Sequence, residues 1–227
     1  MNNLWIFGDS NSALNTQLKN TTVRYGEYMD IVGDFDVWSE HLAKKINFNL
    51  HNHALIGSSN YTIFDTFCSK ISKINDGDIV IINWSVNNRF RVGDGHGKFL
   101  EILPQWISTD EFKFGEMFKV LTENDLTIEA LEMIGANRFS SETLDQNEVN
   151  SWSKFIEDYC IIKNVKILFW GICPYQDYFV IDGQKSIEEL GGLIYQETNN
   201  MINDKHFGKN GHLLFAEKMF NFLNTYK

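Results

Sequence analysis

The sequence is poor in cysteine. Its three cysteines, Cys68, Cys160 and Cys173, are an odd number, and they lack the close spacing of metal ligands. This usage is typical of reduced thiols in a cytosolic protein rather than of a disulfide framework. We expect no metal and no other cofactor, since no cluster of metal-ligating residues is evident in the sequence.

Basic residues and long apolar runs are also scarce. Lys and Arg number 20 against 30 Asp and Glu, which gives a net charge of −10, and the longest basic run is Lys44-Lys45. This balance argues against nucleic acid and anionic membranes as partners. No apolar run approaches the roughly 20 residues of a membrane span, and the first residues have no basic and apolar leader pattern. We therefore expect a cytoplasmic protein.

What is present is an alternation of strand-like and helix-like segments. With 227 residues, the chain suits a single α/β domain over 1–227. Alternation of this kind predicts a parallel sheet with right-handed crossovers. The predicted strands are 4–7, 48–55, 79–82 and 165–171, with 178–181 as the best candidate for a fifth. The predicted helices are 36–46, 57–73, 126–137, 146–163, 185–201 and 211–225.

Residues 88–125 break this alternation. The segment is long and rich in glycine and aromatic residues, and connections of that length often carry function. An accessory subdomain with its own small core is an equal alternative. We treat 88–125 as an inserted loop or subdomain.

The two ends of the chain carry residues suited to nucleophilic catalysis. The first apolar run stops at Gly8-Asp9-Ser10, and Asp204 and His206 lie in a polar loop before the last helix. Ligands of open α/β sheets bind at the carboxyl edge of the strands, and a Ser-His-Asp triad is recognised by role rather than by order. The first stretch is also typical of an ordinary strand-to-helix turn in which Asp9 is a cap.

Together these stretches resemble the SGNH (GDSL-type) hydrolase family. Gly8-Asp9-Ser10 matches its first block, Asn52 and Gly57 match its second, and His206 with Gly211 keeps the spacing of its last. The resemblance implies a three-layer α/β/α fold with a flavodoxin-like parallel sheet of about five strands, and an insertion after the third strand. It also implies Ser10 as nucleophile, His206 as base and Asp204 as the carboxylate that orients it.

The chain departs from the family at two places. The family's Asp lies three residues before its His, where this chain has Asn203, so the orienting role goes to Asp204. The third block, Gly-x-Asn-Asp, is replaced by a segment in which Ser85 stands at the position of the asparagine and Asn87 follows. The predicted oxyanion donors are therefore Ser10, Gly57 and either Ser85 or Asn87. Losing one such donor typically costs about 10²–10³ in rate.

Three further residues are candidates for contacting substrate: Asp9, Trp84 and Arg89. Their alternatives are, respectively, a helix cap, a core tryptophan and a solvated arginine.

The favoured function is a serine esterase that acts on short acyl esters, with O-acetyl groups on carbohydrate as a candidate substrate. A small-molecule or glycan ester is thus the expected partner, and the sequence leaves the oligomeric state open. One alternative is a non-catalytic glycan-binding module on the same fold. Another is a phosphate or nucleotide binder that uses residues 8–12 as an anion cradle, in which Asp204 and His206 would have no purpose.

Overall fold

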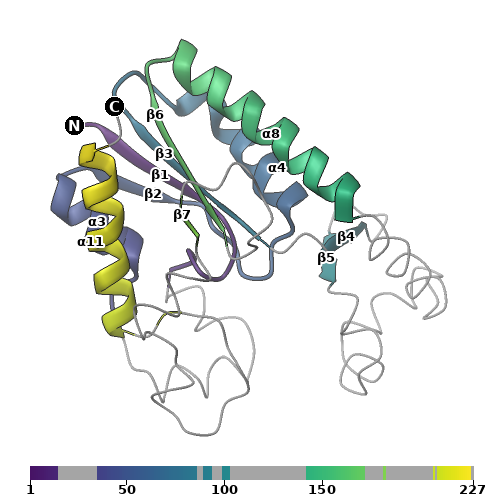
Figure 1. Ribbon diagram of the computed structural model, residues 1–227, viewed down its shortest axis with the longest axis horizontal. Helices are drawn as coiled ribbons and strands as arrows, with labels where there is room; N and C mark the ends of the chain where they lie inside the picture. The colour runs from purple at the N-terminus through teal and green to yellow at the C-terminus, as the bar shows by residue number, and fades with distance from the viewer. Residues whose placement is uncertain are drawn as a thin grey trace, which may run out of the picture.

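A computed structural model describes residues 1–14, 35–85, 89–93, 99–102, 142–171, 181–182, 207 and 209–225. Its centre is a sheet of five parallel strands in the order β2-β1-β3-β6-β7 (Figure 1). The strands are β1 (Asn3–Phe7), β2 (Asn49–Asn52), β3 (Ile79–Trp84), β6 (Lys166–Gly171) and β7 (Ile181–Asp182). Because β1 lies between β2 and β3, its carboxyl end lies beside the segments that follow these two strands.

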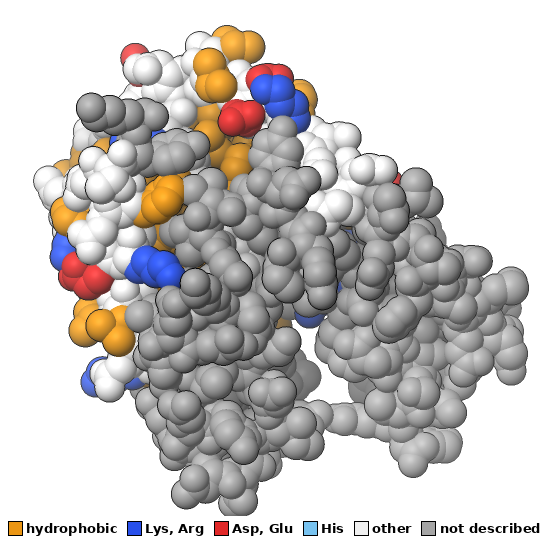
Figure 2. Space-filling model, in the orientation of Figure 1, with side chains coloured by type: hydrophobic (Ala, Val, Ile, Leu, Met, Phe, Trp, Pro, Cys, Tyr) orange, Lys and Arg blue, Asp and Glu red, His pale blue; other side chains and the backbone are white. Residues whose placement is uncertain are grey.

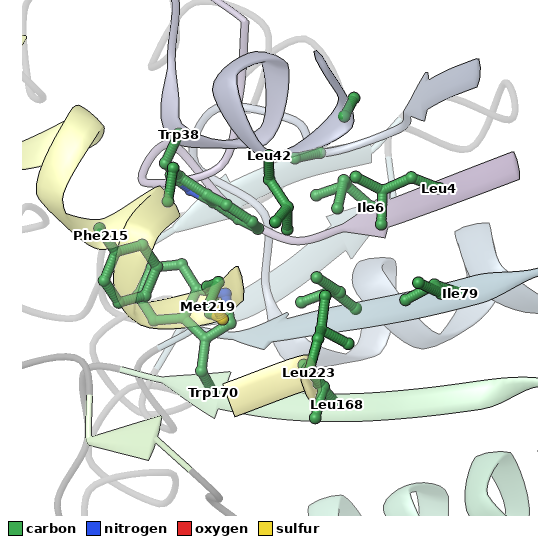
Figure 3. Close-up of a cluster of buried hydrophobic side chains, with 14 of the residues drawn as sticks. Leu4, Ile6, Trp38, Leu42, Ile79, Leu168, Trp170, Phe215, Met219 and Leu223 are labelled. Atoms are coloured by element: carbon green, nitrogen blue, oxygen red, sulfur yellow. The ribbon is translucent and has the colours of Figure 1, made fainter. Parts of the chain in front are cut away.

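Strand β1 presents apolar side chains alternately to the two faces of the sheet, as a period of two requires. Leu4 and Ile6 of β1 belong to one core cluster, and Trp5 and Phe7 belong to the other. The first cluster is covered by α3 (Trp38–Ile46) and α11 (Lys209–Thr225), as Figures 1 and 3 show. The second is covered by α4 (Asn60–Lys70) and α8 (Glu142–Ile162). The predicted three-layer α/β/α arrangement is therefore confirmed.

Most element boundaries agree with the sequence prediction to within a few residues. The helix predicted from 57 begins at Asn60, because the Ser59 hydroxyl caps it by accepting from Thr62 N at 3.3 Å, and it ends in a 3₁₀ turn at Ile71–Lys73. Strand β2 is shorter than predicted, α8 begins four residues earlier, and β7 overlaps the predicted fifth strand only at Ile181. The helices predicted over 126–137 and 185–201 lie outside the described residues.

The insertion begins with a hairpin that the sequence analysis did not predict. Strands β4 (Phe90–Gly93) and β5 (Phe99–Ile102) pair antiparallel and form a sheet of their own. Arg91 anchors the hairpin to α4, since its guanidinium lies 4.2 Å from the centre of the Tyr61 ring and 3.7 Å from the Asp65 carboxylate. Apart from Arg89 and these two strands, residues 88–125 are outside the described residues.

The described surface carries several large apolar side chains. They lie mainly on α8 and α11, and they include Phe155, Ile161, Ile162, Leu213 and Leu214. Figure 2 shows hydrophobic side chains at separate places on the described part of one face. Scattered exposure of this kind is normal for a folded domain. Within the described ranges, no helix is both long and apolar enough to cross a bilayer.

Candidate functional site

The end of β1 is shaped by a close approach between Gly8 and Asn83 of β3. A Cβ atom placed on Gly8 would lie 2.6 Å from Asn83 Cβ and 2.9 Å from Asn83 Oδ1. Asn83 is fully buried, and its Oδ1 accepts from Ser12 Oγ at 3.0 Å and from Asp9 N at 3.4 Å. Glycine is required here by space, and Asn83 fixes the turn that follows. The sequence analysis did not select Asn83, although a polar residue that interrupts a buried apolar strand at its carboxyl end was a usable signal.

Asp9 organises the turn that carries Ser10. Its Oδ1 accepts from Asn11 N at 3.0 Å and from Asn11 Nδ2 at 3.2 Å, and its carbonyl accepts from Ser12 N and Ala13 N. This is an Asx-turn, in which the side chain bonds to backbone two residues on. Asp9 is only 3% exposed, and its carboxylate supports the turn through the two bonds to Asn11. Ser10 is half-buried between these fixed residues.

The loop after β2 is tied to the same turn. Asn52 Nδ2 donates to Ser12 O at 2.7 Å and to Ser39 Oγ at 3.0 Å, and Leu55 N donates to Gly8 O at 2.9 Å. Gly57 follows with a φ of 79°, in the left-handed region that glycine adopts without strain. The loop that presents the Gly57 N–H is thus held against the end of β1.

Ser85, the residue after β3, is hydrogen-bonded to an arginine. Its backbone N–H donates to Asn60 Oδ1 at 2.7 Å, and its carbonyl accepts from Asn60 Nδ2 at 3.2 Å. Its hydroxyl accepts from Arg89 Nη1 at 3.0 Å. Ser85 is fully buried, and its hydroxyl is in contact with the Arg89 guanidinium. Asn87 lies outside the described residues.

Trp84 does not line the site, which corrects its selection as a substrate-contacting candidate. It is fully buried between β3 and α8, where its Nε1 donates to Ser153 Oγ at 3.0 Å. Its ring is parallel to that of Phe169, with centroids 6.5 Å apart. The cause is strand alternation, because Trp84 falls on the face of Val80 and Ile82, which α4 and α8 cover.

Asp204 and His206 lie outside the described residues, but the chain on their carboxyl side is anchored near the turn. Phe207 is buried, with its ring centroid 6.4 Å from that of Trp170 and 4.7 Å from that of Phe215. Trp38 packs in the same cluster and donates from its Nε1 to Asn11 O at 3.0 Å. Phe207, which follows His206, therefore belongs to the same core cluster as Trp38, which is hydrogen-bonded to Asn11, the residue after Ser10.

His212 has a structural role in this cluster. It is 7% exposed, and its Nδ1 accepts from Trp38 N, at the start of α3, at 3.2 Å. The N-cap residue of α3 is Val37, which has no side-chain acceptor to offer. In a catalytic triad the base donates from Nδ1 to a carboxylate, whereas Nδ1 of His212 is an acceptor. This arrangement fits a helix cap rather than a triad base.

Burial shifts the pKa of a described side chain in the loop after β2 and of another in the last turn of α8. Burial lowers the pKa of His53, which stacks on Trp5 and Phe7. Burial also raises the pKa of the Cys160 thiol to about 12, which leaves it unreactive at neutral pH. The described ranges contain no group of three or more His, Cys, Asp or Glu side chains that could hold a metal ion.

No family model matches the sequence, and no curated protein matches it. Among solved structures, the chain is similar to a carbohydrate esterase whose active site is described as having divergent catalytic and non-catalytic binding functions. The TM-score is 0.41 at 12% identity, over 100% of this chain and 65% of the esterase chain, so this chain spans less than two thirds of that protein. It is also similar to a structure described as a putative lipolytic protein of the G-D-S-L family from Desulfitobacterium hafniense DCB-2. There the TM-score is 0.34 at 15% identity, over 97% and 99% of the two chains.

Proposed function

We propose that this chain is a serine esterase that removes short acyl groups, with O-acetyl esters of carbohydrates as the substrate class. The observation that carries the proposal is the setting of Ser10. It stands at the carboxyl end of a central parallel strand, on a turn fixed by Asp9 and Asn83. The Gly57 loop is hydrogen-bonded to the residue at which that turn begins.

In this proposal Ser10 Oγ attacks the ester carbonyl while His206 accepts its proton. His206 then returns the proton to the leaving alcohol, and Asp204 holds its tautomer. The backbone N–H groups of Ser10 and Gly57 donate to the tetrahedral oxyanion. Water then attacks the acyl-enzyme with His206 as base again, which releases the acid and regenerates Ser10.

The experiment compares wild type, Ser10→Ala and Ser12→Ala. Hydrolysis of p-nitrophenyl acetate and butyrate is measured, and each protein is treated with a fluorophosphonate and mapped by mass spectrometry. We expect an adduct on Ser10 in the wild type and in Ser12→Ala, and neither adduct nor hydrolysis in Ser10→Ala. Ser12 is the control for the position of labelling: its hydroxyl is buried and bonded to Asn83, so its removal can slow labelling through the turn but leaves the nucleophile Ser10 in place. Circular dichroism verifies that each variant is folded.

A second candidate is a glycan-binding module without activity. It is favoured by the third block, where a buried Ser85 replaces the asparagine amide that the family resemblance implies. The same experiment separates the two. Folded wild-type protein that neither hydrolyses either ester nor forms a Ser10 adduct would refute the esterase proposal and favour binding.

A further inference from the structure

Arg89 joins the chain segments that follow the two neighbours of β1. Its Nη1 donates to Ser58 O at 2.9 Å, in the segment after β2, and to Ser85 Oγ at 3.0 Å, at the end of β3. Since β1 lies between β2 and β3, the guanidinium is held at the same edge of the sheet as Ser10. Both Nη1 protons are used by these two bonds, and they fix the orientation of the guanidinium plane.

The other edge of the guanidinium has no protein partner among the described residues. Nε is buried and without a hydrogen bond, and the hydrogen bonds found for this side chain are both made by Nη1. Nor does any described carboxylate form an ion pair with Arg89, whereas Arg91, two residues on, has Asp65. A shortage of carboxylates is not the reason, because the chain has 30 acidic and 20 basic residues.

A partly buried guanidinium without a counter-ion is costly, because its charge has lost water and gained no anion. Buried donors of native proteins are almost always paired. The Nε–Nη2 edge is one of the two faces through which arginine binds the two oxygens of a carboxylate in parallel hydrogen bonds. A group that enters the site is the natural partner for this edge.

We propose that Arg89 binds a carboxylate of the substrate through its Nε–Nη2 edge. The inference rests on the proposed esterase function and narrows its substrate class to esters of acidic molecules, in particular acetylated sugars that carry a carboxylate. Arg89 then determines specificity, and Ser58 and Ser85 position it. The substrate carboxylate then supplies the counter-ion that no described residue provides.

The test uses two sets of sugars that differ only in the carboxylate. Methyl glucuronoside acetylated singly at each ring hydroxyl is compared with methyl glucoside acetylated at the same positions, and acetate release gives kcat and KM. We expect the wild type to prefer the acidic sugar in kcat/KM by about 10- to 100-fold at one or more positions, the range for a charge-assisted pair of hydrogen bonds. The acidic sugars should have the lower KM, while kcat should be similar on the two sets.

Three variants locate the effect. Arg89→Gln should abolish the preference, so that kcat/KM falls further on the acidic sugars than on the neutral ones, and Arg89→Lys should keep only part of the preference, since lysine lacks the planar fork. Arg91→Gln is the matched control. It removes the same charge two residues away, where the guanidinium is engaged by Tyr61 and Asp65, and it should preserve the preference.

Equal rates on the two sets by wild type would overturn the inference, as would an equal loss on both sets in a folded Arg89→Gln. The second result would mean that Arg89 only holds the loops or acts on the reaction itself. Failure of the esterase proposal gives a different pattern, namely no acetate release from any sugar and no fluorophosphonate adduct on Ser10. In that case the inference falls with it.

Discussion

Replacement of Gly8 by alanine tests whether the close approach of β1 and β3 positions Ser10. The new Cβ would lie 2.6 Å from Asn83 Cβ, whereas ordinary van der Waals contact begins at 3.4 Å. The two atoms must therefore separate by about 0.8 Å, the difference between these distances. Both belong to stiff parts of the chain, so the backbone has to move. Overpacking of this kind costs about 1–3 kcal/mol, which for a protein of this size lowers Tm by roughly 2–12 °C.

The same displacement reaches the turn directly, since Asp9 N and Ser12 Oγ both bond to Asn83 Oδ1. A shift near 1 Å in a catalytic group costs on the order of 10²-fold in rate. We therefore expect fluorophosphonate to label Gly8→Ala about a hundredfold more slowly than wild type, measured by mass spectrometry at a temperature where both are folded. Urea unfolding gives the loss of stability.

A double-mutant comparison isolates the contact. Asn83→Gly in the Gly8→Ala background removes the clashing Cβ, so the combined loss of stability should be smaller than the sum of the single losses. Asn83→Ala keeps that Cβ and should give no such relief. A Gly8→Ala protein with wild-type stability and labelling rate would refute the reasoning, because it would mean that the two strands can separate without loss of stability.

Three further predictions concern residues around the turn. Gly57→Ala meets no atom within 4 Å but must hold a φ of 79°, so it should lose about 1–2 kcal/mol in urea unfolding, while Gly57→Asn should lose less; equal losses would contradict the backbone argument. His212→Ala removes the acceptor of Trp38 N and should cost about 1–3 kcal/mol, yet Ser10 should still be labelled; a folded variant without labelling would instead make His212 the base. The lowered pKa of His53 means that the unfolded chain binds its proton first as pH falls. The stability that His53 contributes is complete above about pH 6.5 and is lost as pH drops through the folded-state pKa. His53→Gln should reduce the fall of the urea unfolding midpoint below about pH 6.5. A midpoint that depends on pH as in the wild type would contradict this prediction.

The sequence by itself determined the order of strands and helices in this protein, because the signals for these elements are local. Unbroken apolar runs predict strands buried on both faces, and the helical periodicity of 36–46 predicts α3 within two residues of where it begins. Gly8-Asp9-Ser10 at the end of the first run indicated a turn at the carboxyl edge of the sheet, and the structure has that turn. Each of these inferences needed only neighbours a few residues apart.

The tertiary structure decided what the polar and aromatic residues at that edge do. Strand alternation sends Trp84 into the core beneath α8 and Asn83 toward the turn, and only the paired sheet reveals which face each one meets. Arg89 contacts a carbonyl 31 residues away, and His212 accepts from a helix N-terminus 174 residues away. Such contacts depend on which segments the fold brings together. Packing between segments that are far apart in the sequence determines this, and local propensity does not.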